Sequence, residues 1–126
     1  MAQILIVDDS KALRSSIRNC IEQDTDWKVC GEAENGQMAI AKVMELQPDL
    51  VVLDLAMPVM NGLDAAREIT NIAPNLAMVL FTIYVSGELE KEAKAVGIGD
   101  VVSKAEGGTE QLLASIRFLL ERAGVH

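Results

Sequence analysis

The sequence predicts an α/β fold, a doubly wound parallel sheet of five strands with helices on both faces. Five short apolar runs alternate with five longer segments whose apolar residues recur at three- and four-residue spacing. Continuous apolar runs of this length are typical of strands buried on both sides. The helical segments between them provide the right-handed crossovers that parallel strands require. A chain of 126 residues fits one such unit, so we expect residues 1–126 to form one domain.

The first strand and helix follow directly from the amino terminus. The run 4–7 is continuously apolar and ends at Asp8 and Asp9, as a buried strand does at the edge of a sheet. Either Asp9 or Ser10 can cap the helix that follows. Arg14 lies outside the apolar stripe of this helix. The stripe consists of Leu13, Ile17, Cys20 and Ile21.

The second and third strands are separated by another helix. Residues 27–33 form a more exposed strand, and the Asn-Gly pair at 35–36 begins a helix that Pro48 ends. The run 50–53 is again wholly apolar and again ends in a carboxylate, Asp54. The inward-facing residues of the intervening helix are Ala39, Ile40, Val43 and Leu46.

The second half of the chain repeats this pattern. The Asn-Gly pair at 61–62 begins a helix to about Ile72, and the strand 76–81 ends at Thr82.

Two more helices enclose the last strand. A helix over 86–96 closes at Gly97, a strand over 100–103 ends at Lys104, and the Gly-Gly pair at 107–108 leads into the final helix. The apolar face of that helix, which we interpret as core, consists of Leu112, Leu113, Ile116, Leu119 and Leu120.

Polar residues stand at the carboxyl ends of four predicted strands. They are Asp8, Asp9, Asp54, Thr82 and Lys104. Each alone is most often a helix cap, a turn former or a solvated charge. Together they converge on one edge of the sheet, where doubly wound folds bind their ligands.

The carboxylates in this set predict a magnesium site. Three carboxylates held close together repel by about 1 kcal/mol per pair in bulk water and about 4 kcal/mol at the effective dielectric of a protein surface. Lys104 alone cannot balance them, whereas Lys104 and one dication can. Mg²⁺ prefers oxygen ligands, and the absence of His or Cys at these strand ends argues against zinc.

Asp54 is the best candidate for a nucleophile that attacks phosphorus. It stands alone at the end of a central strand, whereas Asp8 and Asp9 are adjacent and fit a metal-holding pair. A metal and a cationic side chain stabilise charge on a transferring phosphoryl group and so favour an acyl phosphate. Lys104 is expected to pair with one phosphoryl oxygen, and the Thr82 hydroxyl is expected to donate to another.

Composition excludes several other functions. The net charge of −8 argues against binding of nucleic acid or of an anionic membrane surface. Cys20 and Cys30 match no zinc or redox spacing, and we expect both to be reduced and buried. Met1 leads into an apolar run too short to span a bilayer, which places the protein in the cytoplasm. His126, the only histidine, is not expected to be a ligand.

Over essentially its whole length, the sequence resembles the receiver domains of response regulators in two-component signalling. The matching stretches are ILIVDD at 4–9, PDLVVLD at 48–54, Met57-Pro58, Asn61-Gly62, Phe81-Thr82 and VSK at 102–104. The resemblance implies a flavodoxin-like sheet with strand order 2-1-3-4-5. It also implies a phosphorylation-dependent switch rather than an enzyme, a protein that catalyses only its own phosphotransfer and dephosphorylation.

The resemblance also implies roles for individual residues and partners. Asp54 receives the phosphoryl group from a phosphohistidine of a sensor histidine kinase. Mg²⁺ is bound directly by Asp9, Asp54 and the main-chain carbonyl of Ala56, and largely through water by Asp8. The last two helices and the last strand form the surface for homodimerisation or output. A DNA-binding output domain, common in the family, is compatible with a chain that continues beyond these residues.

Four positions bear on how the switch works. Members of the family commonly carry an aromatic residue where this chain has Val101, a small one where it has Ile83, and a proline where it has Ala105. A valine cannot fill or vacate a ring-sized pocket, so Tyr84 or a loop rearrangement is expected to replace the aromatic switch. Ile83 is expected to slow phosphotransfer or hydrolysis, and the bond before Ala105 is not expected to be cis. Ala56 and Tyr84 resemble the positions that tune the lifetime of the acyl phosphate in the family. Ala56 offers no group to activate water and Tyr84 is expected to shield the site, so the resemblance implies a phosphoryl lifetime of many minutes or longer.

Two alternative functions stay open. A receiver-like scaffold that is never phosphorylated is compatible with Val101 and Ile83. An aspartyl-nucleophile phosphatase needs an acid/base carboxylate two residues after the nucleophile, where this chain has Ala56, so it is the weaker alternative. A dinucleotide-binding module is excluded because no Gly-x-Gly-x-x-Gly follows the first strand.

Overall fold

The computed structural model describes residues 1–125, so His126 and the expectation that it is not a ligand lie outside the described residues. Within that range five strands alternate with five helices, as the sequence predicts. The elements are β1 (Gln3–Val7), α1 (Lys11–Asp24), β2 (Lys28–Ala33), α2 (Gly36–Leu46), β3 (Leu50–Leu53), α3 (Gly62–Ile72), β4 (Ala77–Thr82), α4 (Gly87–Ala95), β5 (Asp100–Ser103) and α5 (Gly108–Arg122).

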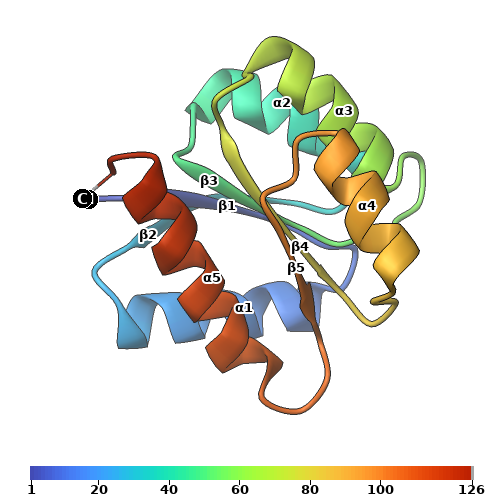
Figure 1. The fold of residues 1–126 in the computed structure, drawn as a ribbon. Coiled ribbons are helices and arrows are strands. Elements are labelled where there is room, and N and C mark those ends of the chain that lie inside the picture. Colours follow the sequence, from blue (N-terminus) through green and yellow to red (C-terminus); the bar gives the residue numbers. More distant parts are fainter. Residues whose placement is uncertain (126) are drawn as a thin grey trace.

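The strands form one parallel sheet in the order β2-β1-β3-β4-β5. Helices α1 and α5 cover one face, and α2, α3 and α4 cover the other (Figure 1). This is the doubly wound, flavodoxin-like arrangement that the sequence predicts, and the prediction is confirmed. The chain crosses from one side of β1 to the other between β2 and β3, so the carboxyl ends of β1 and β3 flank the topological switch point.

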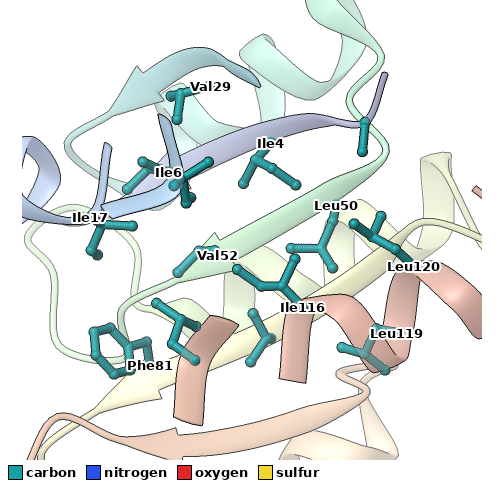
Figure 2. Packing of buried hydrophobic residues seen from close by; sticks show 14 of the residues in the cluster. Ile4, Ile6, Ile17, Val29, Leu50, Val52, Phe81, Ile116, Leu119 and Leu120 are labelled. Carbon is teal, nitrogen blue, oxygen red and sulfur yellow. The ribbon is translucent and has the colours of Figure 1, made fainter. Parts of the chain in front are cut away.

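Successive residues of the central strands pack on opposite faces, which divides the core in two. Ile4 and Ile6 of β1 join the cluster beneath α1 and α5, whereas Leu5 and Val7 join the cluster beneath α2, α3 and α4. Figure 2 shows the first cluster, in which side chains of the sheet meet those of α5. The labelled contributors from α5 are Ile116, Leu119 and Leu120, all buried, so the interpretation of this helix face as core is confirmed.

Side-chain caps explain where four of the helices begin. The side chains of Ser10, Asn35, Asn61 and Ser86 each accept a hydrogen bond from the backbone N–H three residues later. Ser10, rather than Asp9, therefore caps α1, which leaves the Asp9 carboxylate free for another role.

Some expectations about boundaries and burial are wrong by small amounts. Trp27 and Leu76 each lie one residue before their strands, and Thr82 is the last residue of β4 rather than the first after it. Cys20 and Cys30 are free, as expected, but only half-buried. Cys30 lies on β2, an edge strand paired only with β1, and Cys20 lies at the margin of the α1 stripe whose buried residues are Ile17 and Ile21. No helix in the described part of the chain is long and apolar enough to cross a membrane.

Candidate functional site

The predicted site residues are positioned by the ends of neighbouring strands. Because β1 pairs with β3 in parallel, Val7 lies beside Leu53, and the next residues, Asp8 and Asp54, leave the sheet at the same level. The Asp54 N–H donates to the Val7 carbonyl at 2.9 Å, which continues the ladder by one step. The backbone of the Asp54 position is therefore fixed by the sheet itself rather than by a flexible loop.

Asp8, Asp9 and Asp54 form a compact carboxylate cluster. Each residue offers one carboxylate oxygen, and these three oxygens all lie within 4.8 Å of one another. Asp8 and Asp54 are buried, whereas Asp9 is exposed at the rim. Two of the three negative charges are thus withdrawn from water. Their mutual repulsion is poorly screened as a result.

Lys104 lies between the two buried carboxylates. Its Nζ donates to Asp8 Oδ2 at 2.8 Å and to Asp54 Oδ1 at 3.0 Å, and it stands 5.9 Å from the centre of the Phe81 ring. The lysine is held there by its own backbone, whose N–H donates to the Thr82 carbonyl at 2.9 Å. The structure therefore brings Asp8, Asp54 and Lys104 into direct contact, as the strand ends predict.

The charge balance of this cluster changes two pKa values. Burial is the main cause that raises the pKa of Asp54, and the neighbouring Asp8 and Asp9 charges add to it, while the hydrogen bond from Lys104 partly opposes it. Burial alone lowers the pKa of Lys104, but the bonds to Asp8 and Asp54 outweigh it and raise that pKa overall. The surroundings of Asp54 thus disfavour its charged form.

The donor set fits a hard divalent cation. Among residues 1–125, Lys104 is the one ammonium group that is bonded to the cluster, so three carboxylates leave a surplus of negative charge. Their oxygens lie close enough together to bind one ion, and carboxylate oxygens are the ligands that Mg²⁺ prefers. Ala56, whose carbonyl is the fourth expected ligand, is exposed in the loop after β3, two residues beyond Asp54.

Thr82 is fully buried at the end of β4, next to Lys104 but without a hydrogen bond to the carboxylates. Its Oγ1 accepts a hydrogen bond from the Tyr84 N–H at 3.1 Å. A hydroxyl has one proton and two lone pairs, so the Thr82 proton stays available for an acceptor. The two residues after it, Ile83 and Tyr84, are 66% and 57% exposed, so the loop between β4 and α4 projects apolar side chains into solvent.

The position of the common aromatic residue is occupied by a packed valine. Val101 is partly buried and contacts the core cluster beneath α2, α3 and α4. The peptide bond before Ala105 is trans, as its sequence predicts. The short β-branched side chain of Val101 thus lies against the core in this state.

The loop after Asp54 depends on a close backbone approach. Gly62 donates its N–H to the Leu55 carbonyl at 2.9 Å, and a Cβ at this position would collide with the Asp54 carbonyl oxygen. Val59, in the same loop, has a φ of 71°, a left-handed conformation that a β-branched residue rarely adopts. The segment that frames the carboxylates is therefore both tightly closed and locally strained.

One polar residue next to the site was not expected from the sequence. Arg14 of α1 was assigned to the polar side of its helix, yet its side chain is only 12% exposed. Its Nη1 donates to the main-chain carbonyl of Asp8 at 2.6 Å, and its Nε donates to Glu32 Oε1 at 2.9 Å. Only two features of the sequence point to these contacts, and both are weak. Arg14 lies one turn after the cap of a helix that begins at the site, and β2 contains one glutamate that can pair with it.

Comparison with known proteins agrees with this geometry. The family model described as response regulator receiver domain matches residues 4–117. The chemotaxis protein CheY of Thermotoga maritima is 37% identical over 102 residues, which cover 81% of this chain and 84% of that protein. The crystal structure of the response regulator domain of Thermotoga maritima CheB matches with a TM-score of 0.89 and 29% identity, covering 96% of this chain and 97% of that chain.

Other relatives are much longer proteins. A protein-glutamate methylesterase/protein-glutamine glutaminase of Caldanaerobacter subterraneus subsp. tengcongensis is 37% identical over 111 residues, which are 87% of this chain but 30% of that protein. A two-component response regulator of the LuxR family from Aurantimonas sp. SI85-9A1 matches with a TM-score of 0.88 and 28% identity, covering 100% of this chain and 88% of that chain. The chain therefore spans under a third of the length of the methylesterase relative that it matches.

Proposed function

This chain belongs to the response regulator receiver domain family and is a phosphorylation-dependent signalling switch, and on that premise we propose that Asp54 is its phosphoacceptor. One observation carries the proposal: Asp54 is buried at the end of a central strand, within 4.8 Å of two further carboxylates and bonded to Lys104. We further propose that residues 1–126 act as one receiver unit.

The residues that hold the metal in this proposal are Asp8, Asp9, Asp54 and, through its main-chain carbonyl, Ala56. The surplus negative charge and the oxygen-only donor set support Mg²⁺ as the ion. Bound Mg²⁺ supplies positive charge that offsets the repulsion between Asp54 and an incoming phosphoryl group.

The chemistry of the chain's own residues is a single displacement at phosphorus. A carboxylate oxygen of Asp54 forms a bond to phosphorus while the bond from phosphorus to the donor breaks, and the donor leaves with that electron pair. With a phosphohistidine of a sensor kinase as donor, the leaving group is the imidazole. The product is an aspartyl phosphate, which water later hydrolyses. The activity of the domain in this proposal is limited to its own phosphotransfer and dephosphorylation.

Lys104 and Thr82 are proposed to bind the phosphoryl oxygens. The Lys104 ammonium already lies 3.0 Å from Asp54 Oδ1, so a phosphoryl group joined to that carboxylate as an acyl phosphate falls within its reach. The Thr82 hydroxyl lies at the end of the next strand and keeps a proton to donate. Because Thr82 Oγ1 also accepts from the Tyr84 N–H, a movement of Thr82 toward the phosphoryl group also moves the loop between β4 and α4.

Switching then depends on backbone movement more than on ring rotation. Val101 is too small to vacate a ring-sized space, whereas the exposed Ile83 and Tyr84 change position whenever the loop does. Phosphorylation adds about −1.5 to −2 charges, which is enough to draw nearby donors inward. The proposed readout is a changed surface over α4, β5 and α5, used for homodimerisation or output.

The partners follow from this chemistry. We propose a sensor histidine kinase as phosphodonor and the cytoplasm as the compartment. The methylesterase relatives support a longer parent protein with an enzymatic output domain, and a DNA-binding response regulator of the LuxR family from Staphylococcus aureus supports one with a DNA-binding domain, whereas CheY has a length similar to that of this chain.

Intact mass spectrometry after incubation with acetyl phosphate and Mg²⁺ tests the proposal. The wild type is expected to gain one phosphoryl mass, Asp54→Asn none, and Asp64→Asn, which alters an exposed aspartate of α3, as much as the wild type. Omission of Mg²⁺ is expected to abolish the gain. A wild-type protein that gains no mass contradicts the proposal and favours the scaffold alternative.

A further inference from the structure

Arg14 contacts the backbone of the carboxylate pair rather than its side chains. Its Nη1 donates to the main-chain carbonyl of Asp8 at 2.6 Å, the shortest polar contact around the site. The N–H of Asp8 donates to the Ala33 carbonyl at 3.0 Å. The main chain at Asp8 is thus held on one side by β2 and on the other by an arginine of α1.

The orientation of that carbonyl affects both aspartates. A peptide unit is planar, so the carbonyl of Asp8 and the N–H of Asp9 lie in one rigid plane. Fixing the direction of the carbonyl fixes the direction in which the Asp9 backbone leaves the strand. The exposed Asp9 carboxylate accepts no hydrogen bond from any described side chain or N–H group, so the orientation of this plane determines where its side chain leaves the backbone.

Arg14 is itself held by a partly buried ionic network. Glu32 of β2 accepts from Arg14 Nε at 2.9 Å through Oε1 and from Arg18 Nε at 2.8 Å through Oε2. These two bonds outweigh the effect of burial and lower the pKa of Glu32, so the glutamate stays charged. Arg14 and Arg18 share the same partner, but Arg18 has no contact with Asp8.

We propose that Arg14 is a positioning residue for the divalent cation, acting through the peptide plane between Asp8 and Asp9. The inference rests on the proposed function, because it concerns the same magnesium site. It assigns to Arg14 no contact with the ion, the phosphoryl group or the nucleophile. Its effect is to hold the Asp9 carboxylate in the orientation in which it joins those of Asp8 and Asp54.

The direction in which the affinity for Mg²⁺ changes when Arg14 is replaced separates a positioning role from a purely electrostatic one. Arg14 is a cation near a cation site, so its charge alone weakens binding of Mg²⁺, and its removal would tighten binding. Loss of a positioning contact has the opposite effect, since residues that orient metal ligands typically contribute about 10- to 100-fold to metal affinity. Arg18→Gln removes the same charge and one bond to Glu32, and so serves as the matched control.

The test is a titration of the isotope-labelled chain with MgCl₂, followed by the backbone amide resonances in NMR spectra. Arg14→Gln is expected to raise the Kd for Mg²⁺ about tenfold, and Arg18→Gln to leave it unchanged or lower it. The Asp9 amide resonance of the metal-free protein is expected to move in Arg14→Gln and to stay in place in Arg18→Gln. With acetyl phosphate, the Mg²⁺ concentration for half-maximal phosphorylation is expected to rise in Arg14→Gln while the maximal rate stays near that of the wild type.

Lysine variants keep the test decisive if Arg14→Gln fails to fold. Lysine keeps the charge but cannot bond Asp8 and Glu32 through a fork, so Arg14→Lys is expected to bind Mg²⁺ more weakly than Arg18→Lys. Equal affinities in the two members of either pair overturn the inference, as does tighter binding by Arg14→Gln. A wild type that binds no Mg²⁺ refutes the proposed function itself, and the inference with it.

Discussion

Asp54→Asn is expected to stabilise the metal-free protein, although it removes a buried ion pair. The three carboxylate oxygens lie within 4.8 Å of one another, so the buried Asp8 repels Asp54 by about 3.5 kcal/mol at an effective dielectric of 20, and the exposed Asp9, which water screens, repels it by less. The bond to Lys104 at 3.0 Å contributes an attraction of about 5.5 kcal/mol on the same scale. The repulsion thus offsets much of the attraction, and burial, the largest cause of the raised pKa of Asp54, turns the balance against its charged form.

The expected gain is about 2 kcal/mol in the free energy of unfolding at pH 7, because Asn removes the charge while its Oδ1 can still accept from Lys104. Urea unfolding followed by circular dichroism, with EDTA present, measures it: the midpoint should rise with an unchanged slope. Asp64→Asn is the control, since it also reduces the net charge by one but alters an exposed aspartate paired with Arg67. A metal-free Asp54→Asn protein less stable than the wild type would show that the Lys104 bond dominates and would refute this account.

The raised pKa of Asp54 also determines how the free energy of unfolding depends on pH. The pKa of Asp54 is raised in the folded state, mainly by burial, so the folded protein binds this proton more readily than the unfolded chain. Stability then falls as pH rises through the folded pKa. The advantage of Asp54→Asn over the wild type is expected to shrink as pH is lowered through that range, and to shrink again when saturating MgCl₂ is added at pH 7.

Three further substitutions test the framing of the site. Gly62→Ala is expected to lose about 2 kcal/mol of stability, because the new Cβ collides with the Asp54 carbonyl. Gly87→Ala is expected to lose none, because a Cβ there meets nothing within 4 Å. The midpoints of urea unfolding compare the two variants. Val59→Asn is expected to raise the free energy of unfolding by about 1 kcal/mol, because Asn tolerates the left-handed φ of 71°. Val85→Asn is the control: Val85 has an ordinary φ, so the same assay is expected to show no comparable gain. Lys104→Met is expected to lose about 3 kcal/mol in EDTA and to recover part of it with MgCl₂, since the metal replaces the missing counter-charge; loss unaffected by MgCl₂ would contradict this.

The fold and most of the site could be predicted from the sequence because both follow from burial. A strand covered on both faces has no place for a charge, so Asp8 and Asp54 mark strand ends without ambiguity. Parallel pairing then brings these ends to one edge, and Lys104, from the last strand, to the same edge. The convergence of the five polar residues needs only the order of the strands.

Arg14 and the precise burial of the cysteines could not be predicted, for a different physical reason. Helical periodicity tells which residues face the core but not how an individual long side chain reaches across a helix end. Arg14 lies outside the apolar stripe, yet its guanidinium extends to the Asp8 carbonyl and to Glu32 on a separate strand. Cys30 has the right pattern for burial but lies on the edge strand, which has one neighbour instead of two.

Lys104 connects the state before phosphorylation with the state after it. In the structure its ammonium is shared between Asp8 and Asp54, so it serves as counter-ion to the cluster. A dication bound among the carboxylates would replace Lys104 as their counter-ion. The proposed phosphoryl group carries more negative charge than either carboxylate and then competes with them for the same ammonium. Thr82, the second donor, is bonded through Oγ1 to the Tyr84 N–H, so a shift of its hydroxyl toward the phosphoryl group is expected to move the loop between β4 and α4. We therefore expect the movement that carries the signal to begin in this loop rather than at Val101.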